Sequence, residues 1–362
     1  MSLAAPVRYT PAVEEIQPDE RETIQGLNDT FDTILETTAK EDGHAVRSVH
    51  AKAHAILEGR MVIADGLPPE LAQGLFARPG EHRVLMRIST NAGDILPDTI
   101  SLPRGLALKV LDVEGERLPG AQGTTQDFIM VNGPMFQAKT ADKFLGNLKM
   151  LAATTNRMEG VKEAMSGVAR GLNTVLSAVG IESTKLQSLG GAPNVDPMGE
   201  TYYSVTPFRY GDYIAKFSIV PVAPALLALK DKEIDATDNP DAIRDTVRSE
   251  MQGIDGVWEF RVQLCRDLER QPVEDPTVQW DEDEAPFRTV ATITIPRQDS
   301  WEPARVQAVN EEMHFMIWTG LAAHQPLGNI NRARREAYLH STRFRERFNR
   351  CPVHEPGTRS AS

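Results

Sequence analysis

Eight short segments rich in β-branched and aromatic residues constrain the fold of this chain most strongly. Turn residues such as Pro79-Gly80 and Pro119-Gly120 separate them, and no regular alternation of strand and helix connects them. The segments are residues 48–63, 82–90, 105–111, 128–131, 201–205, 212–222, 257–265 and 287–295. Strands arranged in this way form an antiparallel sheet or a closed barrel. We therefore predict an α+β fold built on an eight-stranded antiparallel β-barrel.

Helical segments interrupt and follow the predicted barrel. Apolar residues recur at spacings of three and four at Phe144, Leu148 and Leu151, which predicts a helical insertion over about residues 137–195. Two more helical stretches, residues 303–321 and 329–347, follow the last strand. The predicted organisation is an N-terminal arm at residues 1–45, the barrel with its insertion at 46–300, C-terminal helices at 301–350 and a tail at 351–362.

The charge balance and the cysteine content limit the partners of this chain. Its 39 basic and 51 acidic residues give a net charge of −12, which repels phosphate backbones and argues against a nucleic-acid partner. The first forty residues contain neither a basic start followed by an apolar run nor a stretch long enough to span a bilayer. We therefore expect a cytoplasmic protein without a membrane span. The two cysteines show no metal-type spacing, and no G-x-G-x-x-G or Walker sequence indicates a nucleotide cofactor.

A tyrosine near the C-terminus has the spacing of a metal-binding phenolate. Arg334 precedes Tyr338 by four residues, so the two side chains share one face of a helix, and Arg345 follows seven residues later. A neighbouring cation favours the charged form of an acid, and tyrosinate is one of the axial ligands that proteins use for haem iron. The same pair is common on ordinary surface helices, so the spacing alone leaves both interpretations open.

Five sequence blocks resemble the haem-catalase superfamily in their order and spacing. They are RSVHAKA at residues 47–53, RIST at 87–90, PRGLALK at 103–109, DFIMVNGPMF at 127–136 and RREAY at 334–338. The corresponding family patterns are R-x-V-H-A-K-G, R-F-S-T, P-R-G-F-A-V-K, D-x-V-G-N-N-T-P-x-F-F and R-x-x-x-Y. The resemblance implies a catalase-like barrel that encloses haem b, in a small member of the kind called catalase-related peroxidases.

The resemblance also implies a role for each matching side chain. His50 corresponds to the distal histidine of the family, and Ser89 corresponds to the hydroxyl that hydrogen-bonds and orients its imidazole. Tyr338 corresponds to the proximal iron ligand. The residues expected to contact the cofactor or its ligand are Arg47, Val49, Arg87, Phe136, Phe144, Arg334 and Arg345.

These residue types also suit a haem pocket on chemical grounds. Haem is a flat apolar disc with two carboxylates at one edge, so guanidinium groups such as those of Arg47, Arg87 and Arg345 suit its rim. A neutral imidazole at His50 can take a proton from one peroxide oxygen and return it to the other. An anionic Tyr338 would donate charge to the iron. We therefore expect a haem-dependent, peroxide-reactive oxidoreductase.

One position beside the distal histidine departs from the family pattern. The first asparagine of the family's Asn-Asn pair falls on Val131, and the second falls on Asn132. Valine cannot donate a hydrogen bond, and Asn132 reaches the same face of a strand only if a bulge shifts the register. Loss of one positioned donor costs on the order of 10²-fold in rate. With Asn132 kept as a catalytic candidate, we expect peroxidase-like oxidation of a small organic reductant by hydrogen peroxide or an organic hydroperoxide, with weak catalase activity.

The sequence leaves several alternatives open. The chain can be a haem- or lipid-binding barrel without turnover, or an enzyme that rearranges organic hydroperoxides, although relatives of that kind carry threonine where this chain has Val49. His50 and His54 can form a zinc or iron site, because they share one face of the predicted strand. Catalases are typically oligomers, so a homo-oligomer is an expected state, although the segments that interlock their subunits are shortened here. The histidines interpreted as structural or exposed are His314, His324 and His340.

Overall fold

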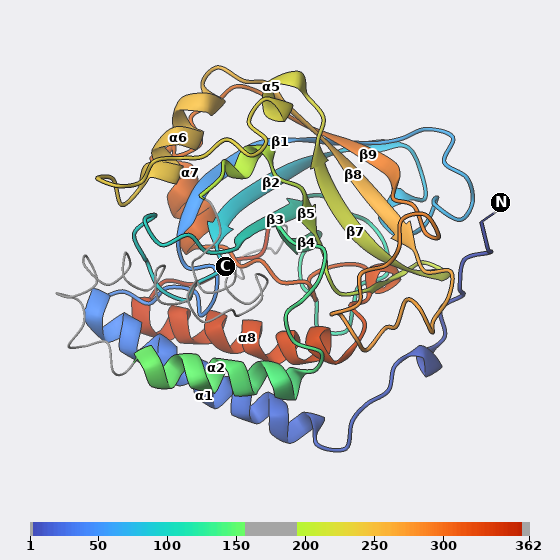
Figure 1. The fold of residues 1–362 in the computed structure, drawn as a ribbon, viewed down its shortest axis with the longest axis horizontal. Coiled ribbons are helices and arrows are strands. Elements are labelled where there is room, and N and C mark those ends of the chain that lie inside the picture. Colours follow the sequence, from blue (N-terminus) through green and yellow to red (C-terminus); the bar gives the residue numbers. More distant parts are fainter. Residues whose placement is uncertain (1–2, 156–193, 357–362) are drawn as a thin grey trace, which may run out of the picture.

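Strand pairing closes eight antiparallel strands into a barrel, which confirms the predicted fold class (Figure 1). The computed structural model describes residues 3–155 and 194–356. The barrel strands are β1 Ala53–Ile63, β2 Gly80–Thr90, β3 Arg104–Val110, β4 Gln126–Val131, β5 Tyr202–Tyr203, β7 Tyr213–Pro221, β8 Gly256–Leu264 and β9 Arg288–Ile295. The short strand β5 closes the ring, because it pairs with β4 on one side and with β7 on the other. A further strand, β6 Phe208–Tyr210, pairs with β7 as a hairpin.

Aromatic rings fill the interior of the barrel. The rings of Phe76, Phe128, Tyr210, Phe217 and Phe260 are almost completely buried. The ring centroids of Phe128 and Phe260 lie 4.7 Å apart, and those of Phe76 and Phe260 lie 5.1 Å apart. Successive side chains of a strand point to opposite faces, so the neighbours of these inward residues face outward. The interior is therefore a packed core, and a binding site has to lie on the outer face of the strands.

Three helices form a layer along one side of the barrel (Figure 1). They are α1 Glu20–Asp42, α2 Ala141–Thr155 and α8 Asn329–Asn349. Apolar side chains from all three share one core, which includes Leu27 and Phe31 of α1, Leu145 of α2 and Ala333 of α8. The close approach of α1 and α2 depends on Gly26, where an added Cβ would lie 2.8 Å from a methyl carbon of Leu145. The remainder of the predicted helical insertion, residues 156–193, lies outside the described residues.

Shorter helical elements connect the strands. The helices α5 Pro224–Leu227 and α6 Ala242–Met251 lie at the end of the barrel opposite the three-helix layer (Figure 1). Single turns of 3₁₀-helix occur at η1 Pro11–Val13, η2 Gly74–Phe76, η4 Pro197–Gly199 and η6 Ala322–His324. The imidazole of His324 is fully buried among the barrel rings, where its Nε2 accepts a hydrogen bond from the Leu75 amide over 3.0 Å. The structural role expected for His324 agrees with this position.

The helix predicted over residues 303–321 is wrong in its second half. The structure contains α7 Pro303–Val306 and one π-helical turn, η5 Gln307–Glu311, after which the chain is irregular. The reason is that the backbone amides of this segment find partners on strand β4 instead of within a helix. The Met316 amide donates to Oδ2 of Asp127 over 2.8 Å, and the Leu321 amide donates to Oε1 of Gln126 over 2.8 Å. These contacts tie the segment before α8 to the barrel.

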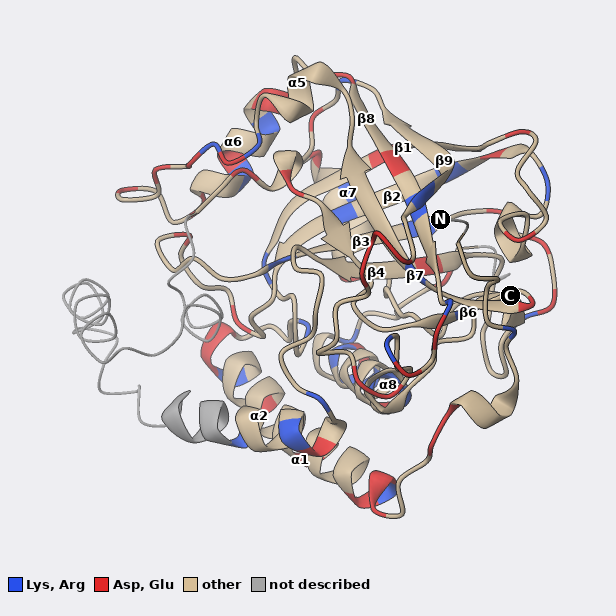
Figure 2. Ribbon diagram, turned by 45° about the vertical axis from the view of Figure 1, so that its right-hand side comes forward, with Lys and Arg blue, Asp and Glu red and all other residues tan. Residues whose placement is uncertain are grey.

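Charged residues of both signs are interspersed along the loops and helices in the view of Figure 2, and they also occur on several strands. Because both signs are present, the net charge is only −12 over 362 residues. None of the described helices combines the length and the apolar character that a membrane span needs.

Candidate active site

A pocket lies on the outer face of strands β2, β3 and β4, where residues of helix α8 complete its wall. Arg87, Ala107 and Ile129 are paired neighbours across these strands, and all three line the pocket. The pocket has a volume of about 560 Å³, which includes the solvent at its mouth. The pocket-lining residues that the sequence singles out are Arg47, Val49, His50, Arg87, Ser89, Tyr338 and Arg345. Strand pairing and helix α8 thus bring together side chains that are far apart in the sequence.

His50 lies just before strand β1, so the predicted strand begins later than residue 48. Its backbone has φ = 54°, in the left-handed region. The loop after β2 holds this segment, because the His50 amide donates to the Asn91 carbonyl over 3.2 Å and the Ala51 amide donates to the Ala92 carbonyl over 2.9 Å. A non-glycine residue in this region costs of the order of 1–3 kcal/mol, and such residues cluster at functional sites. The turn directs the imidazole toward the pocket, which it lines.

The His50 imidazole is oriented by Ser89 and lies against strand β3 at Gly105. Its Nδ1 lies 3.1 Å from Oγ of Ser89, and Nε2 makes no hydrogen bond within the described residues. Gly105 permits this position, because an added Cβ there would lie 2.3 Å from Cε1 of the imidazole. Burial, followed by the charges of Arg87 and Arg334, lowers the pKa of His50 to about 3. The imidazole is therefore neutral near pH 7 and can accept a proton at Nε2.

Val131, and not Asn132, shares the face of β4 that lines the pocket. Gly105 pairs directly with Val131, and the register between β3 and β4 runs without a bulge. Oδ1 of Asn132 accepts from the Arg104 amide over 2.9 Å, and its Nδ2 donates to Oε1 of Glu200 over 2.7 Å. We therefore correct the assignment of Asn132 as a catalytic residue, because its amide is committed to partners on the opposite face of the strand.

Tyr338 lines the same pocket from helix α8. Nη2 of Arg334, one helical turn earlier, donates to the Tyr338 hydroxyl over 3.2 Å. Nη1 of Arg334 donates to Oδ1 of the buried Asn331 over 3.3 Å, so the guanidinium is held from two sides. A cationic donor on the phenol oxygen stabilises negative charge on that oxygen. This pair places a phenol oxygen with a cationic hydrogen-bond donor in the pocket wall.

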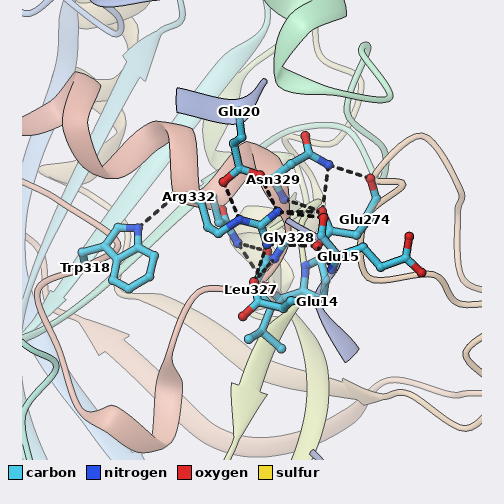
Figure 3. Close-up of polar contacts among 11 residues, drawn as sticks. Glu14, Glu15, Glu20, Glu274, Trp318, Leu327, Gly328, Asn329 and Arg332 are labelled. Carbon is cyan, nitrogen blue, oxygen red and sulfur yellow. Dashed lines mark hydrogen bonds and ion pairs between the residues drawn. The ribbon is translucent and has the colours of Figure 1, made fainter. Parts of the chain in front are cut away.

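The N-terminal end of α8 is held by a carboxylate cluster around Arg332 (Figure 3). Nη1 of Arg332 lies 2.6 Å from Oε1 of Glu14 and 2.9 Å from Oε1 of Glu274, and Nε lies 2.7 Å from Oε1 of Glu20. Glu14 and Glu20 come from the N-terminal arm, whereas Glu274 lies in the loop between β8 and β9. We refer to these four residues as the Arg332 cluster. It fixes the position of the helix that carries Tyr338.

Arg47, Arg87 and Arg345 converge on the turn that follows α7. Nη1 of Arg47 donates to the Asn310 carbonyl over 2.7 Å, Nε of Arg87 donates to Oδ1 of Asn310 over 3.1 Å, and Nη2 of Arg345 donates to the Glu311 carbonyl over 2.7 Å. No carboxylate pairs with these guanidiniums within residues 3–155 and 194–356. Burial, followed by the charge of Arg345, lowers the pKa of Arg87 to about 9. A buried group of guanidiniums without a carboxylate partner is an environment that binds anionic groups.

Solved catalase structures have the same architecture as this chain. Catalase A from Saccharomyces cerevisiae aligns with a TM-score of 0.59 and 19% sequence identity over 88% of this chain. A fungal catalase aligns with a TM-score of 0.58 and 17% sequence identity over 88% of this chain. A bacterial catalase aligns with a TM-score of 0.58 and 16% sequence identity over 99% of this chain. The fold is that of the catalases. This chain spans 65%, 64% and 67% of the lengths of those three chains. No protein-family model and no curated protein sequence matches it.

Phe136 and Phe144 lie beside the pocket of this catalase fold, not among its lining residues. Their ring centroids are 5.4 Å apart, and the rings are inclined by 51°. Both rings pack with Val49 against the core shared by α1, α2 and α8. Of these three residues, only Val49 also lines the pocket.

His314 is a pocket residue that the sequence did not reveal. Its Nε2 lies 3.0 Å from Oε2 of Glu355, and Oε1 of Glu355 lies 2.6 Å from Nζ of Lys109, which also pairs with Asp127 over 2.7 Å. Burial lowers the pKa of His314 to about 4, against the opposing effect of Glu355. The sequence gave no sign that His314 lines the pocket, because it is a single histidine in a stretch predicted to be helical. The contact depends on a carboxylate near the C-terminus and on a non-helical backbone.

His54 does not join His50 in a metal site. It is completely buried, and its Nε2 lies 2.5 Å from Oγ1 of Thr90. Within the part of the chain that the structure describes, no group of three or more His, Cys, Asp and Glu side chains could hold a metal ion. The geometry therefore gives no support to the zinc or iron site considered for His50 and His54.

Proposed function

We propose that this chain is a haem-dependent oxidoreductase that reacts with peroxides, with peroxidase-like activity and weak catalase activity. The observation that carries this proposal is the composition of the pocket wall. A neutral imidazole at His50 and a phenol at Tyr338 line one pocket with three guanidiniums that have no carboxylate partner among the described residues. The catalase fold, which this chain shares, supports the same assignment.

The described residues fit haem b in three respects. Tyr338, with the Arg334 donor on its hydroxyl, is the proposed iron ligand. Arg47, Arg87 and Arg345 match the two carboxylates at the edge of the porphyrin. The outer face of the strands contributes two apolar lining residues that suit a porphyrin face, Ala107 and Ile129.

When bound, the haem iron would supply peroxide binding and the electron transfer of the reaction. The chain itself supplies proton transfer. Nε2 of His50 would take a proton from one oxygen of the peroxide and return it to the other oxygen, which would leave as water or as an alcohol. Ser89 holds Nδ1, so that Nε2 keeps its direction during both transfers. The low pKa of His50, about 3, keeps this base unprotonated near neutral pH.

Val131 determines the expected balance between the two activities. It presents an alkyl group where catalases resembling this sequence present an amide donor, so a second peroxide lacks one polar contact beside His50. Loss of one positioned hydrogen-bond donor lowers the catalytic rate on the order of 10²-fold or more. We therefore propose that hydrogen peroxide or an organic hydroperoxide is the oxidant and that a small organic molecule is the reductant.

Reconstitution with haem tests this proposal directly. The purified chain should give a ferric Soret band with the high-spin features of phenolate ligation, and Tyr338→Phe should lose those features. Tyr213→Phe, on strand β7 outside the pocket, is the matched control and should keep them. The reconstituted protein should oxidise guaiacol with hydrogen peroxide or cumene hydroperoxide faster than it evolves oxygen.

Two results would contradict the proposal. Absence of any Soret band after haem addition would remove the cofactor assignment, and the lipid-binding alternative would then be the better one. Vigorous oxygen evolution without guaiacol oxidation would remove the peroxidase assignment. A Soret band without any turnover would indicate a haem-binding barrel.

A further inference from the structure

Asn310 accepts hydrogen bonds from three arginines that line the pocket, two of them through its side chain. Its side-chain oxygen Oδ1 accepts from Nη1 of Arg47 over 3.1 Å and from Nε of Arg87 over 3.1 Å. Its backbone carbonyl accepts from Arg47 over 2.7 Å and from Nη2 of Arg345 over 3.4 Å. The three arginines come from the segment before β1, from β2 and from α8. One residue of the π-helical turn η5 therefore holds three distant parts of the chain.

The acceptors at this point are all neutral. Arg47 also donates to the carbonyls of Val309 and Met313, and Arg345 also donates to the carbonyl of Glu311. Amide oxygens accept hydrogen bonds but carry only a partial charge, so they orient a guanidinium without cancelling its charge.

The carboxylate of Glu311 acts on the three guanidiniums through its charge, but both of its oxygens make their hydrogen bonds elsewhere. Oε2 of Glu311 lies 2.8 Å from Nε2 of His44, and its Oε1 accepts from Nδ2 of Asn310 over 2.8 Å. The Asn310 amide thus places its nitrogen toward the acid and its oxygen toward the arginines. Arg87 and Arg345 both line the pocket, and Nη1 of each has no acceptor among the described residues.

We propose that Asn310 is a positioning residue that fixes Arg47 and Arg87 through a neutral acceptor, so that their charge stays available to the carboxylates of the porphyrin. This inference deepens the proposed function and rests on it. Aspartate at this position would keep the acceptor that faces the arginines, and it would replace the amide donor to Glu311 with a second carboxylate oxygen. It would also form charged hydrogen bonds to both guanidiniums and repel the incoming carboxylates.

The test compares haem with haem dimethyl ester, in which both carboxylates are esterified and neutral. Titrations of the apoprotein, followed at the Soret band in one detergent-containing buffer, give both dissociation constants. Wild type should bind haem at least tenfold more tightly than the ester. Asn310→Asp should weaken haem binding at least tenfold and leave ester binding within about twofold of wild type. Gln307→Glu, an exposed position in the same turn, makes the same amide-to-acid change away from the pocket and should retain the wild-type preference.

The outcomes separate this inference from the proposed function. If wild type binds neither porphyrin, the proposed function fails. If wild type prefers haem and Asn310→Asp keeps that preference undiminished, the role of Asn310 fails while the proposed function stands. Asn310→Ser covers the case in which the aspartate variant does not fold. It removes the shared acceptor without adding charge, and it should weaken haem binding several-fold while the ester is unaffected. Unchanged haem binding in Asn310→Ser would also overturn the inference.

Discussion

Nη2 of Arg334 donates a hydrogen bond of 3.2 Å to the hydroxyl of Tyr338, and its Cζ lies 5.5 Å from the centroid of the Tyr338 ring. The guanidinium therefore contacts both the phenol oxygen and the ring face. No other described side chain donates to this hydroxyl.

Replacing Arg334 should weaken iron ligation by the phenol. A hydrogen bond to a charged group contributes about 1.5–3 kcal/mol, so Arg334→Leu should lose that stabilisation of the phenolate. The phenolate features of the ferric spectrum should diminish, and haem should dissociate on the order of tenfold faster. Stopped-flow transfer of haem to excess apomyoglobin measures the rate. Arg335→Leu is the control, because Arg335 contacts the Pro119 carbonyl and the Trp318 ring, not Tyr338. Equal dissociation from both variants would contradict the role of Arg334.

Restoring an amide beside His50 should raise catalase activity. Val131 pairs with Gly105 below the imidazole, so Val131→Asn places a donor on the face of β4 that lines the pocket. Oxygen evolution from hydrogen peroxide should rise on the order of 10²-fold relative to guaiacol oxidation. An oxygen electrode and a guaiacol assay on the same preparation give the ratio. Asn132→Leu is the comparison, since its amide bonds to Glu200 and Arg104; it should not change the ratio.

His50 should make the stability of the apoprotein depend on pH. Burial and nearby arginines lower its folded pKa to about 3, whereas the unfolded imidazole titrates near ~6.5. Between these values the unfolded chain binds the proton and the folded chain does not. Stability is therefore complete above pH ~6.5 and falls as the pH drops toward 3, by at most about 1.4 kcal/mol per pH unit. Urea unfolding should show that the free energy of unfolding falls from pH 7 to pH 5 by about 1–2 kcal/mol more in wild type than in His50→Gln. Equal losses in the two proteins would contradict the low pKa.

The Arg332 cluster should stabilise the fold strongly. Arg332→Leu leaves Glu14, Glu20 and Glu274 clustered and unpaired, and removing one partner of such a pair costs about 3 kcal/mol or more. Urea unfolding at pH 7 should show this loss, and Arg343→Leu, at an exposed position of the same helix, should show almost none.

The pH dependence of that loss gives a second check. Burial alone would raise the pKa of Glu274, but hydrogen bonds from Arg332 and Asn329 lower it. A lowered folded pKa gives stability that is present above the unfolded value of about 4.3 and disappears as the pH falls. The difference in unfolding free energy between wild type and Arg332→Leu should therefore shrink as the pH falls below about 4.3, which unfolding at pH 5 and pH 3 would detect. A constant difference would show that the cluster acts by packing and not by charge.

The parts of the fold that depend on local pattern could be predicted from the sequence. The barrel strands follow from β-rich runs bounded by turns, and α8 follows from its helical spacing. The contact between Arg334 and Tyr338 depends on two residues one helical turn apart. Each of these features depends only on residues that are close together in the sequence.

The parts that could not be predicted depend on partners far along the chain. Residues 312–321 have helical apolar spacing, yet their amides bond to Gln126 and Asp127, which no local rule reveals. His314 enters the pocket wall for the same reason. Asn132 failed as a catalytic candidate because the register of β3 and β4 has no bulge, a property that only the paired strands display. Asn310 has no sequence signal, since its role exists only where three segments converge.

The bond between Glu14 and Arg332 joins positions 318 residues apart. During synthesis, the N-terminal arm could meet its partner on α8 only after residue 332 had emerged from the ribosome. The same helix carries Tyr338 and Arg345, so a porphyrin could be captured only after synthesis of the pocket's last wall. Docking of α1 against α8 and completion of the pocket wall consequently depend on the same segment of the chain.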